Sequence, residues 1–122
     1  MATYQLEVRV TPNQDLLLCN IGTAQRGSIR QALAALGFAS EEATPRLERH
    51  AIACPALPTC GLAITESERI LPAVLARLEA LLTRLGIERQ LLVRMTGCPN
   101  GCARPYMAEI GLVGSGVDHY QL

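Results

Sequence analysis

The chain has 122 residues, 49% of them hydrophobic and 18% charged, which suits one globular domain or a piece of a larger protein. Its eleven basic residues are all arginine and are balanced by eleven acidic residues, so the charge favours neither nucleic acid nor an anionic membrane surface as a partner. No apolar run approaches the roughly 18 residues that a membrane span needs, and no signal-peptide profile opens the sequence, so we expect a cytoplasmic protein.

The first third of the chain predicts a strand hairpin followed by a helix. Apolar residues alternate in TYQLEVRV, TPNQD supplies turn residues, and LLLCNI has the character of a second, more buried strand. Ser28 is placed to cap a helix over residues 29–38, and Gly37 is placed to end it.

A linker is expected over residues 39–46, where charged residues, Ser, Thr and Pro follow one another without periodicity. This divides the chain into a first part, residues 1–38, and a second part, residues 47–122.

The second part alternates strands with a helix. A short strand over residues 46–53 runs directly into the loop CPALPTCG, whose prolines cannot continue a sheet. Thr65 and Glu68 have capping-box spacing, Pro72 suits a first helical turn, and a leucine-rich stripe continues to Gly86. Two further strands are predicted, at residues 89–95 and 106–114, on either side of the loop TGCPNGCARP. The order predicts an α/β (α+β) fold with a mixed sheet and helices on one side.

The cysteines are the residues that carry chemistry. An odd count of five in a protein expected to be cytoplasmic argues against disulfides and favours a metal site or catalysis. Each of two pairs lies in a loop just past the carboxyl end of a predicted strand, which is where open α/β sheets place ligands. The candidate ligands are Cys54, Cys60, Cys98 and Cys102. Cys19, among apolar neighbours, is expected to be a buried strand thiol.

Four thiolates suit a soft metal or an iron–sulfur cluster. Five residues separate Cys54 from Cys60, which is wider than the two to four that structural zinc pairs usually have. Glycines beside the cysteines let the backbone approach a bulky inorganic core. The residues alone leave three alternatives open: an iron–sulfur cluster, a structural zinc ion, or four buried structural thiols.

A family resemblance narrows these alternatives. ACPALPTCGLAITESERILP followed by RMTGCPNGCARPYMAEIGLVG resembles the paired signatures of the sulfite reductases that carry siroheme and an iron–sulfur cluster. VTPNQDLLLCNI resembles the ferredoxin-like half-domain that precedes these signatures. The resemblance extends from about Glu7 to the C-terminus and is stronger toward ferredoxin-dependent sulfite reductase than toward nitrite reductase of the same superfamily.

The resemblance implies six-electron reduction of sulfite to sulfide, with ferredoxin or a flavoprotein reductase as electron donor. It implies that the four cysteines hold a four-iron four-sulfur cluster and that Cys102 also bridges the cluster to the siroheme iron, as the catalytic electron conduit. Thr96 and Asn100 are then candidates to contact siroheme or the cluster sulfides, although Asn in a Pro-Asn-Gly turn is more often simply a turn residue. Arg104, and less strongly Arg94, is a candidate partner for a siroheme carboxylate.

The chain differs from members of that family in its shorter length and in its lack of lysine. Family members are several times longer, and a preceding half supplies Arg and Lys around the substrate anion, whereas this sequence contains no Lys. We therefore expect a C-terminal segment of the enzyme that is inactive without the remainder of the parent protein. Two alternatives of other kinds remain: a stand-alone iron–sulfur electron-transfer module and a zinc-stabilised interaction domain.

Overall fold

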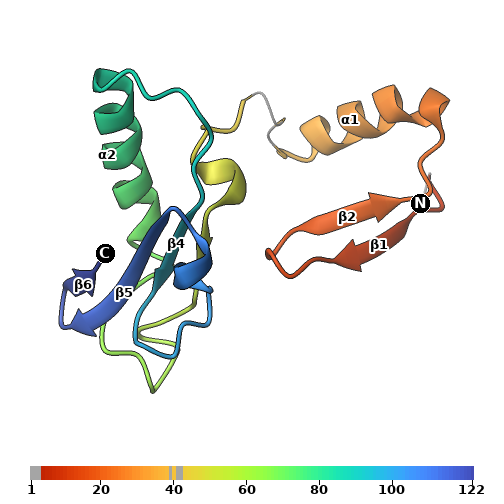
Figure 1. The fold of residues 1–122 in the computed structure, drawn as a ribbon. Helices are drawn as coiled ribbons and strands as arrows, with labels where there is room; N and C mark the ends of the chain where they lie inside the picture. The colour runs from red at the N-terminus through yellow and green to blue at the C-terminus, as the bar shows by residue number, and fades with distance from the viewer. Residues whose placement is uncertain (1–3, 39, 41–42) are drawn as a thin grey trace. The chain divides into compact units, whose positions relative to one another are not determined.

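The computed structural model describes residues 4–38, 40 and 43–122, and its chain divides into two compact units. Unit 1 comprises residues 1–44 and unit 2 comprises residues 45–122 (Figure 1). Part of the predicted linker, residues 39, 41 and 42, lies outside the described residues.

Unit 1 begins with the predicted hairpin. Strand β1 (Glu7–Val10) pairs antiparallel with β2 (Leu16–Cys19), with Val10 opposite Leu16. The connecting turn is closed by the Thr11 amide, which donates to the Asp15 carbonyl at 2.9 Å, and by the Asp15 amide, which donates to Thr11 Oγ1 at 3.2 Å. The TPNQD segment therefore forms the turn that its composition predicts.

Helix α1 (Arg26–Ala35) starts earlier than expected. A 3-10 turn, Thr23–Gln25, leads into it, so Ser28 lies inside the helix and its Oγ donates back to the Gln25 carbonyl at 3.0 Å. The prediction that Ser28 caps this helix was wrong, because the preceding turn already supplies helical backbone. The stop at Gly37 is confirmed: its φ of +87° is a left-handed conformation that glycine adopts without strain.

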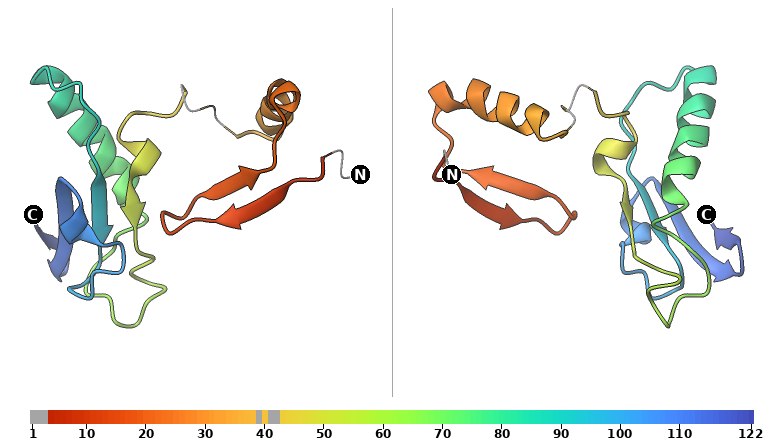
Figure 2. Two further views of the ribbon diagram at one scale, coloured as in Figure 1. Left: turned by 45° about the vertical axis from the view of Figure 1, so that its right-hand side comes forward. Right: turned by 180° about the vertical axis from the view of Figure 1, so that it is seen from behind.

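Unit 2 is built on a mixed four-stranded sheet in the order β3-β4-β5-β6 (Figure 2). Strands β3 (Ile52–Ala53), β4 (Val93–Thr96) and β5 (Ile110–Gly116) are parallel neighbours, and β6 (His119–Gln121) runs antiparallel to β5. The expected mixed sheet is thus present.

Four details of this sheet differ from the sequence prediction. The strand expected over residues 89–95 is the shorter β4, which begins only at Val93. The strand expected over residues 46–53 is mostly a 3-10 turn, Glu48–His50, and only Ile52–Ala53 pair with β4. The strand expected over residues 106–114 begins later, because Pro105–Met107 form another 3-10 turn. Strand β6 was not predicted, since three residues are too few to show an alternating pattern.

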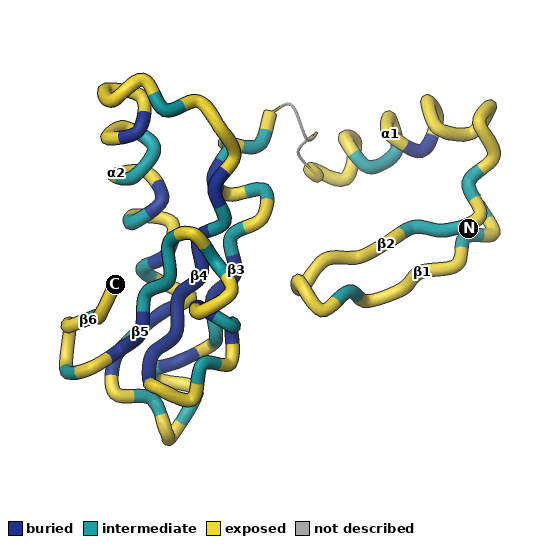
Figure 3. Tube along the Cα trace, viewed as in Figure 1, coloured by how far each residue is buried: buried dark blue, intermediate teal, exposed yellow. Residues whose placement is uncertain are grey.

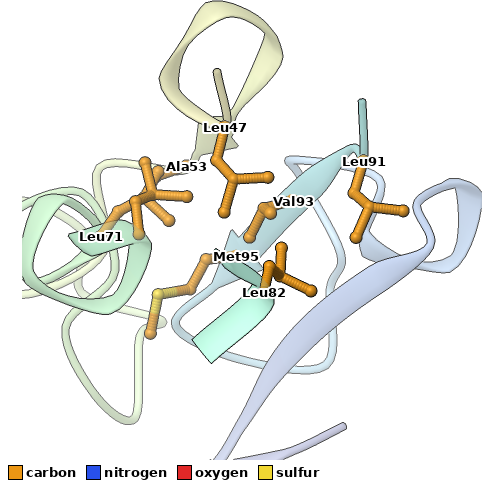
Figure 4. Packing of buried hydrophobic residues seen from close by; sticks show 8 residues of the cluster. Leu47, Ala53, Leu71, Leu82, Leu91, Val93 and Met95 are labelled. Atoms are coloured by element: carbon orange, nitrogen blue, oxygen red, sulfur yellow. The ribbon is translucent and has the colours of Figure 1, made fainter. Parts of the chain in front are cut away.

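Helix α2 (Leu71–Arg84) connects β3 to β4 and supplies one side of the core. Pro72 lies in its first turn and Gly86, with φ of +69°, follows its end, both as expected. The predicted capping box was wrong, because the helix begins at Leu71, six residues beyond Thr65, and no side chain caps it. Figure 4 shows Leu71 and Leu82 of this helix together with Ala53 of β3 and with Val93 and Met95 of β4. The buried cluster contains Leu47, Ala53, Leu71, Leu75, Leu82, Leu91, Val93 and Met95.

The two units differ in how many of their residues are buried. Figure 3 shows buried backbone positions along β3, β4 and one side of α2. In unit 1, Ile29 is the one buried position among the described residues. The packed core, and with it the rigid frame for any site, lies in unit 2.

Candidate functional site

The two cysteine loops begin at the same end of the sheet in unit 2. Because β3 and β4 are parallel, their carboxyl ends point in one direction, and Cys54 follows the first strand as Gly97 and Cys98 follow the second. The Cys54 amide donates to the Met95 carbonyl at 3.1 Å, which extends the ladder into the loop. The chain topology therefore brings the two loops together, as the sequence predicted.

Gly97 joins the two loops through both of its backbone groups. Its amide donates to Cys54 Sγ at 3.3 Å, and its carbonyl accepts from the amides of Ile64 at 2.8 Å and Thr65 at 3.1 Å. Cys54 of the first loop and the segment that follows this loop thus hold the start of the second loop from two sides.

The absence of a side chain at Gly97 is required by this packing. A Cβ there would lie 2.5 Å from the Thr65 carbonyl oxygen and 2.6 Å from Ala56 Cβ. Gly114, on β5, has the same restriction, since its Cβ would lie 2.5 Å from the Gly97 carbonyl oxygen. Two glycines from different segments therefore let the backbones approach to contact distance at the base of the cysteine loops.

Each cysteine pair lies on its own hydrogen-bonded turn. In the first loop the Cys60 amide donates to the Ala56 carbonyl at 2.7 Å. In the second, the Arg104 amide donates to the Gly101 carbonyl at 2.7 Å, and Gly101 has a left-handed φ of +68°. Cys98 is buried, Cys54 and Cys60 are partly exposed, and Cys102 is exposed. Of the four thiols, Cys102 is therefore the most accessible to a group outside the loops.

The donor chemistry suits an iron–sulfur cluster or zinc, since all four side chains are thiols on loops at one end of the sheet. Within the described residues, no group of three or more Cys, His, Asp or Glu side chains is close enough to hold a metal ion. The structure thus brings the loops together, and the Gly97 amide contacts the sulfur of Cys54, one of the four candidate ligands.

The other predicted site residues occupy different environments. Thr96 is fully buried, and its Oγ1 donates to the Leu112 carbonyl at 3.4 Å. Its hydroxyl proton is therefore used in a hydrogen bond between β4 and β5. Asn100 is exposed in the turn of the second loop. Arg104 has a left-handed φ of +56°, and its carbonyl accepts from Arg94 Nη1 at 3.3 Å. Arg94 is buried on β4, and its Nε has no hydrogen-bond partner among the described residues.

Sequence reasoning missed Tyr120, on the unpredicted strand β6. Its Oη donates to the Glu66 carbonyl at 2.7 Å and lies 3.0 Å from Thr65 Oγ1. Burial is the main cause that raises the pKa of Tyr120, the Thr65 hydrogen bond opposes the rise, and the carboxylates of Asp118 and Glu66 add to it. The phenol therefore stays protonated at neutral pH. The sequence did not indicate the contact between Thr65 and Tyr120, because the spacing of Thr65 and Glu68 suggested a helix capping box instead.

Comparison with known proteins shows which enzymes the chain resembles. No protein-family model matches it. It is 50% identical over its whole length to a "Sulfite reductase [ferredoxin]" of Synechococcus elongatus, and 52% identical over 95% of its length to a "Sulfite reductase [NADPH] hemoprotein beta-component" of Acidithiobacillus ferrooxidans. The chain is a homologue of one segment of sulfite reductase. It spans about a fifth of those relatives, 20% and 21% of their lengths.

The structural comparison agrees with this assignment. The Mycobacterium tuberculosis NirA protein matches 92% of this sulfite reductase homologue with a TM-score of 0.72 and 30% sequence identity, and the match covers 20% of that chain. The resemblance inferred from the sequence motifs is thereby confirmed, as is the mixed α/β architecture. Within the described part of the chain, no helix is long and apolar enough to cross a membrane.

Proposed function

We propose that this chain is the cluster-holding segment of a sulfite reductase and that Cys54, Cys60, Cys98 and Cys102 ligate a four-iron four-sulfur cluster. The proposal is supported most directly by one observation: the two cysteine loops are joined at Gly97, whose amide donates to the sulfur of Cys54. Identity of 50% to a sulfite reductase over the whole chain supports the same assignment.

The residues of the chain have distinct roles in this proposal. The sheet and the glycine contacts orient the loops, while the Gly97 amide stabilises negative charge on the Cys54 thiolate. Cys102, the exposed thiol, is proposed as the sulfur shared with siroheme iron and hence as the catalytic electron conduit. Thr96, Asn100 and Arg104 are proposed to line the siroheme side of the second loop. Cluster and siroheme, when bound, supply low-potential electrons and a metal centre for the reduction of sulfite.

Much of the site belongs to the remainder of the parent enzyme in this proposal. The chain has no Lys, so cations for the sulfite anion come largely from that remainder. Residues 1–38 are proposed to belong to the ferredoxin-like half-domain and residues 47–122 to the iron–sulfur domain. Ferredoxin or a flavoprotein reductase is the proposed electron donor; the names of two relatives specify ferredoxin and NADPH.

Anaerobic reconstitution tests this function. The chain is incubated with iron, sulfide and siroheme, and then analysed for iron, sulfide and visible absorption beside a Cys102→Ser variant. We expect cluster-level iron and sulfide, with a tetrapyrrole band that the cluster perturbs in the wild type only. Uptake of one zinc ion per chain and no iron–sulfur cluster would contradict the proposal and favour a structural zinc site.

A cluster without siroheme binding is the second informative result. It would keep the ligand assignment and overturn the proposed bridge at Cys102, leaving an electron-transfer module. A Cys19→Ser variant is the matched control, because Cys19 lies in unit 1 on β2 and is expected to leave iron uptake unchanged.

A further inference from the structure

A chain of three hydrogen bonds connects β6 to the base of the first cysteine loop. The Asp118 amide donates to Thr65 Oγ1 at 3.1 Å, Thr65 Oγ1 lies 3.0 Å from Tyr120 Oη, and Tyr120 Oη donates to the Glu66 carbonyl at 2.7 Å. Each hydroxyl has one proton, and the tyrosine proton is used on Glu66. The Thr65 hydroxyl therefore donates to Tyr120, and the series of donors and acceptors is complete.

The segment that these bonds hold contacts both cysteine loops. Thr65 is 1% exposed, and its amide donates to the Gly97 carbonyl beside that of Ile64. The Gly97 amide in turn donates to Cys54 Sγ. A continuous path of hydrogen bonds thus leads from the tyrosine hydroxyl through Thr65 and Gly97 to a proposed ligand sulfur.

The sheet is shaped to allow this path. Gly114 on β5 is the register partner of Tyr120 on β6. A Cβ at Gly114 would lie 2.8 Å from Thr65 Cγ2 and 2.5 Å from the Gly97 carbonyl oxygen. The missing side chain on β5 therefore leaves the space in which the Thr65 segment lies against Gly97.

We propose that Tyr120 is a positioning residue for the cysteine site: its hydroxyl holds the Thr65–Glu66 segment against Gly97 and so fixes the Gly97 amide on the Cys54 sulfur. The consequence for the cluster rests on the proposed function, whereas the consequence for Cys54 in the metal-free chain does not. Loss of the hydroxyl exposes the Cys54 thiol and weakens an amide–sulfur hydrogen bond, which at a bound cluster disfavours the more negative, reduced state.

The first test uses the metal-free chain. Tyr120→Phe keeps the ring and removes the hydroxyl, and site-resolved alkylation by iodoacetamide with mass spectrometry measures each cysteine. We expect Cys54 to react severalfold faster than in the wild type and Cys19 to react at an unchanged rate. Tyr4→Phe, the same change in unit 1, is the matched control and is expected to alter neither rate.

Variants of Thr65 test the same hydrogen-bond chain independently of Tyr120. Thr65→Val is expected to reproduce the Tyr120→Phe effect, Thr65→Ser to retain the wild-type rate at Cys54, and the double variant Tyr120→Phe/Thr65→Val to add little to either single change. Circular dichroism shows whether each variant is folded. Wild-type alkylation of Cys54 in folded Tyr120→Phe would overturn the proposal, as would loss of the wild-type rate in folded Thr65→Ser.

The second test uses the reconstituted chain and separates the two proposals. The midpoint potential of the cluster in Tyr120→Phe is expected to be more negative than in the wild type, with Tyr4→Phe unchanged. A wild-type chain that takes up no cluster would overturn the proposed function, while the alkylation result still decides the role of Tyr120. A cluster of unchanged potential in Tyr120→Phe would overturn the positioning role at the loaded site.

Discussion

The two units of this chain bury their apolar side chains to very different extents. In unit 1, one side of the hairpin presents Val10 at 80% and Leu16 at 66% exposure. In unit 2, Val93 and Met95 of the central strand are 0% exposed. A two-stranded hairpin is marginal by itself, whereas a four-stranded sheet covered by a helix forms a core. The cysteine loops are carried by the unit that can hold them rigidly.

The two units also differ in whether hydrogen bonds connect a buried strand to a cysteine. In unit 2 the contacts continue from the core into the loops: the Met95 carbonyl accepts from the Cys54 amide and, at 2.7 Å, from Ser67 Oγ. In unit 1, Cys19 ends β2 and is partly exposed, so the prediction that it is a buried strand thiol was wrong. Cysteines in the two units therefore have different surroundings: Cys54 is hydrogen-bonded to the sheet of unit 2, whereas Cys19 lies on a two-stranded hairpin.

The largest expected difference between the two units is in how much the truncation of one apolar side chain lowers the free energy of unfolding. Met95→Ala removes a fully buried side chain and should lower the free energy of unfolding by about 2–5 kcal/mol. Val10→Ala in unit 1 changes an exposed side chain and should alter it by less than about 0.5 kcal/mol. Urea denaturation followed by circular dichroism measures both. Similar losses for the two variants would contradict the contrast between the units.

A smaller effect is expected from crowding the cysteine loops. Gly97→Ala places a Cβ 2.5 Å from the Thr65 carbonyl oxygen and should cost about 1–3 kcal/mol of stability, together with reduced iron uptake. Gly61→Ala is the matched control, because a Cβ there meets no heavy atom within 4 Å. Denaturation and iron analysis of both variants test this. Equal behaviour would mean that the Gly97 contacts do not hold the loops.

The smallest effect is expected at Glu109, where β5 begins. The Leu92 amide, which donates to Glu109 Oε2 at 2.9 Å, is the main cause that lowers the pKa of this carboxyl from its ordinary value of 4.5. A lowered folded-state pKa contributes stability above the unfolded value, and that contribution is lost as pH falls through the folded value. Glu109→Gln should therefore be slightly less stable than the wild type at pH 7, with the difference shrinking below pH 4.5. Thermal denaturation across this range measures it; a difference that grows on acidification would contradict the assignment.

The sequence predicted those features that depend on local chemistry. The turn of TPNQD, the helix stops at Gly37 and Gly86, and the placement of both cysteine loops after strands follow from residue types at short range. The family motifs then supplied the relationship to sulfite reductase, which the comparisons confirm.

The remaining features depend on contacts between distant segments. Thr65 has the spacing of a helix cap, yet its hydroxyl bonds to residues 53 and 55 positions away in the sequence. The short strand β6 pairs with β5 through its backbone, and its Tyr120 bonds to Thr65 and Glu66, which follow the first cysteine loop. No local pattern reports such a contact, so neither the strand nor the tyrosine could be identified from the sequence.

The central claim is that four particular thiols in unit 2 hold one cluster, and site-resolved alkylation before and after anaerobic reconstitution tests it most directly. We predict that iron and sulfide protect Cys54, Cys60, Cys98 and Cys102 together, while Cys19 reacts at the same rate in both states. Protection of Cys19, or unchanged reactivity of the four cysteines in a chain that has taken up iron and sulfide, would contradict the claim.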